Sequence, residues 1–559
     1  VQGGSTAAGF PFYYGGSFAD MLEQRLLQSA PERPVEVINT AMAAVNSYTL
    51  LDFVDEIIEQ EPDIVVIYAG HNEYYGALGV GSTFSLGSSP TLIRLFLSLD
   101  HFKTVQALKA LLSRIASIGK PAVEEGSGGT LMSQVVGEQS IPLGSRLYQA
   151  GLDQFRGNLR RILKRYQKAG VPVYIGTVAS NLRDHRPFVS QLAEATDTEQ
   201  FREAVRALAT AEQRGDSVSV LLELVDRLIA IDSLAADPYY TKGQLLLRAG
   251  RDPEALDAFI AARDRDQLRF RAPQEINDII RAEADAFDAV VVETERRLAT
   301  TAVRGIVGSD LMTEHLHPNV EGYFQLASAF YEQLASDSAV AGWQQTITDD
   351  AARSELLVTE IDSRVGEYRI KQLTGSWPFQ PAGTLSRYTL PERSEDPIEQ
   401  ISLDLFRRKV PRNVALDALR SEYLKQNNFH DALRATLAVV QRYPFLSSPY
   451  VSAASIMVEQ RRLDEALLYV DAALDRDSSA EALSLKGSVL LAKGLRAQAI
   501  PVLESALQLN PESIPTGYNL AGAYALSGRI ADARALVEDI LRRDPGNADA
   551  RRLAESLGR

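Results

Sequence analysis

Three short segments, far apart in the chain, contain the residue types that acyl transfer requires. They are Gly3-Gly4-Ser5-Thr6-Ala7-Ala8-Gly9, Gly70-His71-Asn72-Glu73 and Glu314-His315-Leu316-His317-Pro318-Asn319. Together they supply a serine hydroxyl, a side-chain amide and an acid close to histidines. Hydrolysis of an ester at neutral pH needs an activated nucleophile, a base with a pKa near 7 and preorganised donors for the oxyanion. The three segments therefore indicate a single acyl-transfer site.

The elements that must position these residues alternate between short apolar runs and amphipathic stretches. Residues 35–38, 63–68, 171–175 and 289–292 have the composition of buried strands. Apolar residues at helical spacing mark expected helices at 17–27, 50–58, 147–168 and 320–336. This alternation predicts an α/β fold with a parallel, doubly wound sheet, whose ligands bind beyond the carboxyl ends of the strands. The three polar segments all lie after such strand ends.

The order of the polar segments resembles that of the SGNH/GDSL hydrolase superfamily. That family has Gly-x-Ser-x-x-x-Gly near its start, Gly-x-Asn after a strand, and an acid-x-x-His-Pro segment near the end of the domain. The resemblance covers residues 1–200 and 270–340. It implies a flavodoxin-like, three-layer α/β/α fold that acts through a serine and needs no cofactor.

The resemblance also assigns roles to individual residues. Ser5 is the expected nucleophile, and His317 is the expected general base. Asn72 would donate its side-chain amide to the oxyanion, and the backbone amide of Ser5 would be a second donor. The third donor in the family is a glycine amide, and Ala44 occupies that place here. A backbone donor survives this change provided that φ of Ala44 is negative.

The acid partner is where the chain departs from the family pattern. Glu314 stands where the family usually has Asp, and its extra methylene group alters the geometry. Asp310 is the alternative acid. If residues 314–317 are extended, His315 points away from His317, so pairing Glu314 with His317 requires a turn or a helical loop. His71 and Glu73 lack the spacing of a zinc site, and we expect no metal.

The composition excludes several other classes of protein. A chain of 559 residues with 45% hydrophobic residues should form about two to four domains. The net charge of −15 argues against nucleic-acid binding, which requires a basic face. Without cysteine there is no disulfide framework and no thiolate nucleophile. No run reaches the roughly 18 apolar residues of a membrane-spanning helix.

The first residues bear on localisation. Val1 and Gln2 are only a stub of the strand that should precede the Gly3-Gly4-Ser5 turn. We therefore expect a further segment upstream, in which a signal or an anchor could lie. We suspect an extracytoplasmic protein for this reason, but the sequence does not determine the compartment.

The last third of the chain has a helical repeat. Small residues at matching places of the second helix recur every 33 or 34 residues, at Ala432, Ala466, Ala499 and Ala533. The helix-ending positions keep the same steps, at Pro444, Ser478, Pro511 and Pro545. This is the tetratricopeptide period, in which each helix pair buries its apolar stripe against its neighbours. Together with these repeats, the N-terminal pattern resembles bacterial SGNH members that carry tetratricopeptide units.

One further repeat unit is expected inside the catalytic region. Its matching places are occupied by Gly243, Leu246, Ala255, Phe259 and Ala262. The expected organisation is an SGNH domain at 1–203 and 271–344, a helical insert with one tetratricopeptide-like unit at 204–270, an extended connector at 345–412, and a repeat array at 413–559. Within the first part, the Leu-rich stretch at 82–145 is interpreted as an added helical subdomain, or else as a lid or acyl-binding wall.

These observations leave three functional hypotheses. The leading one is a serine esterase that hydrolyses an acyl or acetyl ester through an acyl-enzyme, with an acylated carbohydrate or lipid as the candidate substrate. The second is O-acyl transfer to a sugar hydroxyl at the same site. The third is a non-catalytic tetratricopeptide scaffold. In each case the repeats are expected to bind a protein or peptide partner.

Overall fold

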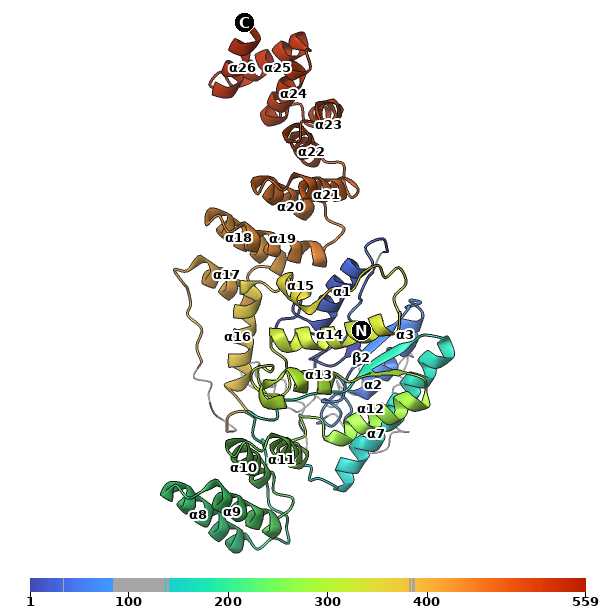
Figure 1. The fold of residues 1–559 in the computed structure, drawn as a ribbon, viewed down its shortest axis with the longest axis vertical. Coiled ribbons are helices and arrows are strands. Elements are labelled where there is room, and N and C mark those ends of the chain that lie inside the picture. Colours follow the sequence, from blue (N-terminus) through green and yellow to red (C-terminus); the bar gives the residue numbers. More distant parts are fainter. Residues whose placement is uncertain (34, 84–135, 137–139, 382–383, 385–387, 559) are drawn as a thin grey trace, which may run out of the picture. The chain divides into compact units, whose positions relative to one another are not determined.

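The computed structural model describes residues 1–33, 35–83, 136, 140–381, 384 and 388–558 (Figure 1). The chain divides into two compact units. The first unit comprises Val1–Ser354 and Gly366–Leu390, and the second comprises Glu355–Val365 and Pro391–Arg559. Most of the Leu-rich stretch that we interpreted as a subdomain or lid lies outside the described residues.

A parallel sheet of four strands forms the centre of the first unit. The strands lie in the order β1-β2-β3-β4 and comprise Gln2–Gly3, Val65–Tyr68, Val173–Gly176 and Val290–Val292. Every residue of β2 and β3 is buried, as expected for apolar runs that are covered on both faces. Three of the four strands that the sequence predicts are therefore present, and they pair in parallel.

Helices cover this sheet in two groups, which lie on opposite sides of it (Figure 1). On one side, Tyr68 of β2 packs against Phe18 of α1 with ring centroids 6.1 Å apart. On the other side, Gln2 of β1 donates to the Leu50 carbonyl of α2 at 3.1 Å and accepts from the Tyr166 hydroxyl of α7 at 2.9 Å. The first group is α1 (Phe18–Ser29), α13 (Thr294–Thr301) and α14 (Val320–Ser336). The second group is α2 (Ser47–Asp52), α3 (Val54–Ile58), α7 (Arg146–Ala169) and α12 (Gln274–Ala286).

The segment at 35–38, which we predicted to be a strand, is not one. It runs along the free edge of β1, where the Val1 amino group donates to Ile38 O at 2.7 Å. Farther along, Thr40 N donates to Val1 O at 2.9 Å and Met42 N donates to Gly3 O at 3.2 Å. Residues 35–42, the edge segment, thus follow β1 in the manner of a neighbouring strand, but their backbone does not form a regular ladder.

A helical insert separates β3 from β4 in the chain. It contains α8 (Thr198–Arg214), α9 (Val218–Ile231), α10 (Ala236–Arg248) and α11 (Asp252–Arg265). In the pair of α10 and α11, a Cβ atom on Gly243 would lie 2.7 Å from the Phe259 ring. The two helices therefore approach each other closely where the repeat pattern places a small residue opposite a large one.

Residues 345–412 are not the extended connector that we expected. They contain α15 (Asp349–Ser354), α16 (Glu360–Thr374) and α17 (Pro397–Phe406). The physical reason is visible in the sequence, because Ile361, Val365 and Tyr368 have helical spacing and are all buried. The prolines of this stretch lie outside the interior of these helices.

The repeat array consists of antiparallel helix pairs. The buried alanines that mark the period, Ala432, Ala466, Ala499 and Ala533, each have an exposed fraction of 0%. They lie on the second helix of successive pairs, as the 33- and 34-residue steps predict. The helices are α18 (Arg412–Lys425), α19 (Phe429–Arg442), α20 (Ser448–Glu459), α21 (Leu463–Leu474), α22 (Ala480–Ala492), α23 (Arg496–Leu509), α24 (Ile514–Leu526), α25 (Ile530–Arg543) and α26 (Ala548–Gly558).

Two helical glycines of the array provide a matched test of this packing. A Cβ atom on Gly487 would lie 2.4 Å from Leu503, whereas one on Gly522 would meet nothing within 4 Å. Alanine at either place gains about 1 kcal/mol of helix propensity, but at Gly487 overpacking should cost about 1 to 3 kcal/mol. We expect Gly487→Ala to unfold at a lower urea concentration than Gly522→Ala, measured by circular dichroism. Equal midpoints would contradict the close approach of α22 and α23.

Candidate active site

Ser5 lies at the carboxyl edge of the sheet, just after β1. The position of Gly3 in β1 leaves no room for a side chain, since a Cβ atom on this residue would lie 2.2 Å from the Tyr68 carbonyl oxygen of the neighbouring strand. Beyond Ser5 the chain winds into a turn, in which Ala8 N donates to Gly4 O at 3.0 Å and Phe10 N donates to Ser5 O at 3.1 Å. This strand-to-turn junction leaves Ser5 partly exposed beside the buried Gly3 and Thr6.

His317 reaches Ser5 from a position 312 residues later in the chain. Its Nε2 atom lies 2.7 Å from Ser5 Oγ, within hydrogen-bond distance. The Phe10 ring packs on the imidazole with centroids 4.6 Å apart. Because Nδ1 faces a carboxylate, the neutral ring carries its proton there and leaves Nε2 free to accept the Ser5 proton. Burial lowers the pKa of His317, and the carboxylate on Nδ1 opposes that change.

Glu314 is the acid that the structure brings to His317. Its Oε1 atom accepts from the His317 backbone amide at 2.9 Å and from His317 Nδ1. Residues 314–317 are not extended but form a turn, which is closed by the bond from Thr313 N to His317 O at 2.8 Å. This turn supplies the loop that the pairing of Glu314 with His317 requires.

Asp310, the alternative acid, is engaged elsewhere. Its carboxylate forms an ion pair with Arg183 at 2.5 Å and accepts from the backbone amide of Val303 at 2.8 Å. Neither bond involves His317.

The segment after β3 holds the turn that carries Glu314. Asn181 N donates to His315 O at 3.0 Å, and Asn181 Nδ2 donates to Glu314 O at 3.1 Å. Next to it, the backbone amides of Leu182 and Arg183 both donate to Val307 O. The carboxyl edge of the sheet therefore positions the acid-histidine turn as well as the serine.

Asn72 lies beside Ser5 because β1 and β2 are neighbours and their following loops meet at one edge. A Cβ atom on Gly4 would lie 2.8 Å from Asn72 Nδ2, so this amide faces the backbone immediately before Ser5. His71 anchors the loop, since its Nε2 bonds to Ala179 O and its Nδ1 accepts from Ala272 N, both at 3.1 Å. Both ring nitrogens are thereby used, and burial lowers the pKa of His71 to about 3.

The condition that we set for Ala44, a negative φ, is not met. Its φ is 60°, in the left-handed region, which costs a residue with a Cβ atom about 1 to 2 kcal/mol. Such a conformation suits glycine, the residue that the family has at this place. Ala44 is tied to the loop after β2, because its carbonyl accepts from Ala77 N at 3.2 Å.

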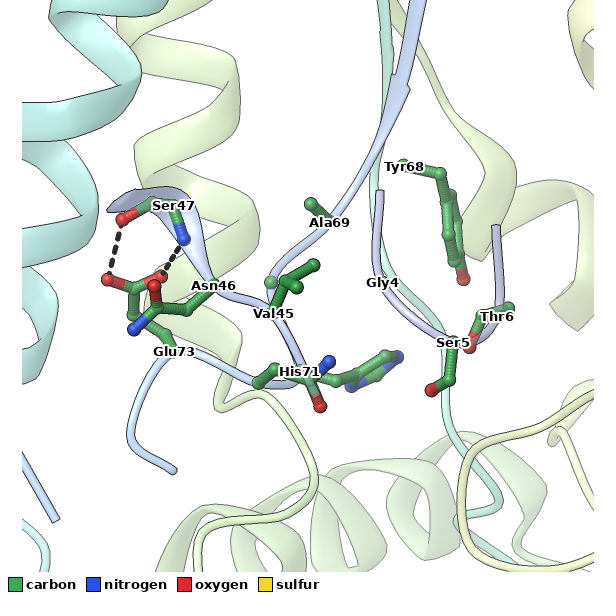
Figure 2. A pocket seen from close by; sticks show the side chains of 12 residues that line it. Gly4, Ser5, Thr6, Val45, Asn46, Ser47, Tyr68, Ala69, His71 and Glu73 are labelled. Atoms are coloured by element: carbon green, nitrogen blue, oxygen red, sulfur yellow. Dashed lines mark hydrogen bonds between the residues drawn. The ribbon is translucent and has the colours of Figure 1, made fainter. Parts of the chain in front are cut away.

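A pocket opens next to Ser5 and extends toward a buried glutamate. Figure 2 shows Ser5 and Thr6 at one end of this pocket and Ser47 and Glu73 at the other. Glu73 accepts from Ser47 Oγ at 2.8 Å, from Ser47 N at 3.2 Å and from Gln154 Nε2 at 2.6 Å. Burial raises the pKa of Glu73 to about 7 against the opposing effect of these bonds. The lining residues are Gly4, Ser5, Thr6, Val45, Asn46, Ser47, Tyr68, Ala69, Gly70, His71, Asn72 and Glu73.

The sequence analysis missed several members of this arrangement. We assigned no role to His315, yet its Nδ1 bonds to Glu314. We assigned no role to Phe10, which packs on His317, or to the Ser47 and Glu73 pair. The adjacency of His315 to Glu314 was the only signal in the sequence for the first of these.

Neither a metal cluster nor a membrane-spanning helix occurs in the part of the chain that the structure describes. No group of three His, Cys, Asp or Glu side chains there could hold a metal ion. No described helix is both long enough and apolar enough to cross a bilayer.

Comparison with known proteins identifies the repeats. Two family models, each described as a tetratricopeptide repeat, match residues 451–514 and 490–557. No curated protein matches the chain. The C-terminal region is thus a tetratricopeptide repeat array, the kind of structure that serves as a scaffold for protein interactions.

Solved structures similar to this chain include tetratricopeptide proteins. The thermophilic TPR protein TTC0263 of Thermus thermophilus is 23% identical over 29% of this chain and 88% of its own, with a TM-score of 0.26. YrrB, a TPR protein with an unusual peptide-binding site, is 19% identical over 29% of this chain and 82% of its own, with a TM-score of 0.25. A further similar structure, MamA from Desulfovibrio magneticus, is 17% identical over 26% of this chain and 84% of its own, with a TM-score of 0.25.

The raised pKa of Glu73 predicts a pH dependence of stability. Between its ordinary pKa of 4.5 and about 7, the folded protein binds a proton that the unfolded chain has released. The contribution of Glu73 to stability therefore falls as the pH rises through this range. We expect the difference in unfolding free energy between wild type and Glu73→Gln to shift by about 2 kcal/mol between pH 5 and pH 8, in favour of the variant at pH 8. Urea denaturation at both pH values measures it, and a difference independent of pH would contradict the buried carboxyl.

Proposed function

We propose that the first unit is a serine ester hydrolase of the SGNH type, which works through an acyl-enzyme on Ser5. The observation that carries this proposal is the hydrogen-bonded chain from Ser5 Oγ through His317 to Glu314. Nucleophilic acyl transfer requires a nucleophile, a base and an acid in this order. The same arrangement of serine, histidine and acid occurs on unrelated folds.

The topology of the sheet supports the same proposal. If the edge segment at 35–42 is counted in chain order beside β1, the spatial order becomes 2-1-3-4-5, which is the flavodoxin-like order. In such sheets ligands bind outside the carboxyl ends of the strands. Ser5 and Asn72 lie at those ends, and the turn of Glu314 and His317 is held there by the segment after β3.

The proposed reaction has two halves. His317 Nε2 takes the proton of Ser5 as Oγ bonds to the ester carbonyl carbon, and the negative charge on the carbonyl oxygen is stabilised by Asn72 Nδ2 and the Ser5 backbone amide. The tetrahedral intermediate then collapses, and the leaving alcohol departs with the proton from His317. In the second half, water loses a proton to His317 as it attacks the acyl carbon. The second tetrahedral intermediate then collapses, His317 returns that proton to Ser5 Oγ, and the acid is released. Glu314 keeps the imidazole oriented and stabilises its charged form.

Transfer to a sugar hydroxyl is the nearest alternative. It uses the same acyl-enzyme, and only the acceptor of the second half differs. Product analysis with and without added sugar separates the two reactions. We propose hydrolysis first because it needs no acceptor site beyond the residues described.

A second candidate function is a scaffold without catalysis. The family matches favour it, since they lie in the repeats and support binding of a protein or peptide partner. A scaffold alone gives no chemical reason for the bond between Ser5 and His317 or for an acid on the far nitrogen. The two functions are compatible if the repeats bring the first unit to an acylated partner.

The nucleophile and base are tested by the hydrolysis of p-nitrophenyl acetate and butyrate. Wild type should release a burst of p-nitrophenol, and Ser5→Ala and His317→Ala should each lower the acylation rate by about 10⁴-fold or more. Circular dichroism checks that both variants are folded. Unchanged hydrolysis in both variants, or none in wild type, would leave the scaffold as the function.

The acid is tested by comparing the two carboxylates that the sequence offers. Glu314→Ala should lower kcat by about 10⁴-fold, because His317 loses its orientation and its counter-charge. Asp310→Ala is the control, since Asp310 pairs with Arg183, and its kcat should stay within about threefold of wild type. A larger loss for Asp310→Ala than for Glu314→Ala would reverse the assignment.

A further inference from the structure

The carboxylate of Glu314 is bound on both of its oxygens, by two different histidines. Oε1 accepts from the backbone amide and Nδ1 of His317, as described above. Oε2 accepts from the backbone amide of His315 at 2.6 Å and from His315 Nδ1. Glu314 itself is only 6% exposed, so these four N–H groups replace water as its donors.

A glutamate at this place needs such a second anchor more than an aspartate would. Its extra methylene adds one torsion, and the terminal torsion of the carboxylate is broad. A carboxylate held on one oxygen can rotate and break the bond to His317 Nδ1. The bond from His315 to Oε2 fixes the plane of the carboxylate, and thereby fixes the oxygen that His317 uses.

The surroundings of His315 keep it a donor through Nδ1. The ring is fully buried, and its Nε2 atom has no hydrogen-bond partner among the described residues. Three phenylalanine rings surround it, with centroids at 5.2 Å for Phe188, 5.9 Å for Phe270 and 5.3 Å for Phe379. Since Nδ1 faces a carboxylate, the single proton of the neutral ring belongs on Nδ1 and the lone pair on Nε2.

Burial and the positive groups near His315 act in the same direction on its pKa, against the carboxylate of Glu314. Burial lowers the pKa of His315 well below its ordinary value, and the positive forms of His185, His317, Arg271 and His71 lower it further. The ring of His185 has its centroid 5.7 Å from that of His315. The imidazole is therefore neutral at the pH at which esters are hydrolysed.

We propose that His315 is a positioning residue for the reaction, which acts only through Glu314 by holding its second carboxylate oxygen. The inference rests on the proposed function, because it concerns the same site. It assigns the two histidines of the Glu314-His315-Leu316-His317 segment different tasks on one carboxylate. His317 moves the proton, and His315 fixes the acid that orients His317.

Two substitutions separate the hydrogen bond from the shape of the ring. His315→Phe keeps a ring in the aromatic surroundings but has no donor, whereas His315→Asn places an amide nitrogen where Nδ1 was. We expect His315→Phe to lower kcat for p-nitrophenyl acetate by about 10- to 100-fold with KM within about twofold of wild type. His315→Asn should recover most of this loss. An Asn variant as slow as the Phe variant would overturn the role of the Nδ1 donor.

A double-mutant cycle with Glu314→Ala tests whether His315 acts through the acid alone. In that background His315→Phe should change kcat by less than about twofold, because the acid that it positions is gone. The same loss of kcat in both backgrounds would mean a general structural role and would overturn the proposal. The burst amplitude counts the active sites, so that a loss of folded protein is not mistaken for a lower kcat.

Low-field proton NMR gives a second readout if the Phe variant does not fold. Wild type should show two ring N–H resonances from Nδ1 atoms bonded to the carboxylate, and Glu314→Ala should lose both. A single such resonance would overturn the shared carboxylate. Wild type without Ser5-dependent hydrolysis would overturn the proposed function and this inference with it. An active wild type matched by an equally active His315→Phe would overturn the inference alone.

Discussion

The hydrogen-bonded carboxylate of Glu314 is the interaction on which the candidate site depends. It joins two histidines within the turn at 313–317 and fixes which nitrogen of His317 faces Ser5. A buried carboxylate is stable only when its oxygens are satisfied, and here four N–H groups satisfy them. With Glu314 so bound, the hydrogen bond between His317 Nε2 and Ser5 Oγ can have only one direction while the imidazole is neutral. The serine is the donor and the imidazole is the acceptor.

The sheet makes this meeting possible between residues that are distant in the chain. Parallel strands end at one edge, so the loops after β1 and β2 and the segment after β3 meet there. Ser5 and Asn72 belong to the first two loops, and Asn181 in the third holds the turn of Glu314. The helical insert lies between β3 and β4 in sequence without interrupting their pairing. The site is therefore split in the sequence and continuous in space.

The strands and the repeats could be predicted from the sequence, because their apolar and small residues recur at regular spacing. Three apolar runs became the strands β2, β3 and β4, and the alanine steps located the buried face of the repeats. The roles of Ser5, Asn72 and His317 were expected from their order along the chain. A shared site was expected as well, but the distances between these residues could not be predicted, because they depend on how the strands pair.

The departures from prediction have local physical causes. The reversal at 313–317 depends on the backbone bond from Thr313 N to His317 O, which no side-chain pattern predicts, and so the bond from His315 to Glu314 was missed. Ala44 adopts a positive φ, although its side chain disfavours that conformation. The edge segment at 35–42 has one strand to bond to and solvent beyond it, which explains why a β-rich sequence does not complete a ladder there.

The central claim is that Ser5 is a nucleophile activated by His317. A fluorophosphonate forms a covalent bond only with an activated serine, so the location of its adduct is the most direct measurement. After treatment of the full chain, peptide mass spectrometry should find the adduct on Ser5 in wild type and none in His317→Ala. Unmodified Ser5 in folded wild-type protein, or an adduct that persists in His317→Ala, would contradict this account.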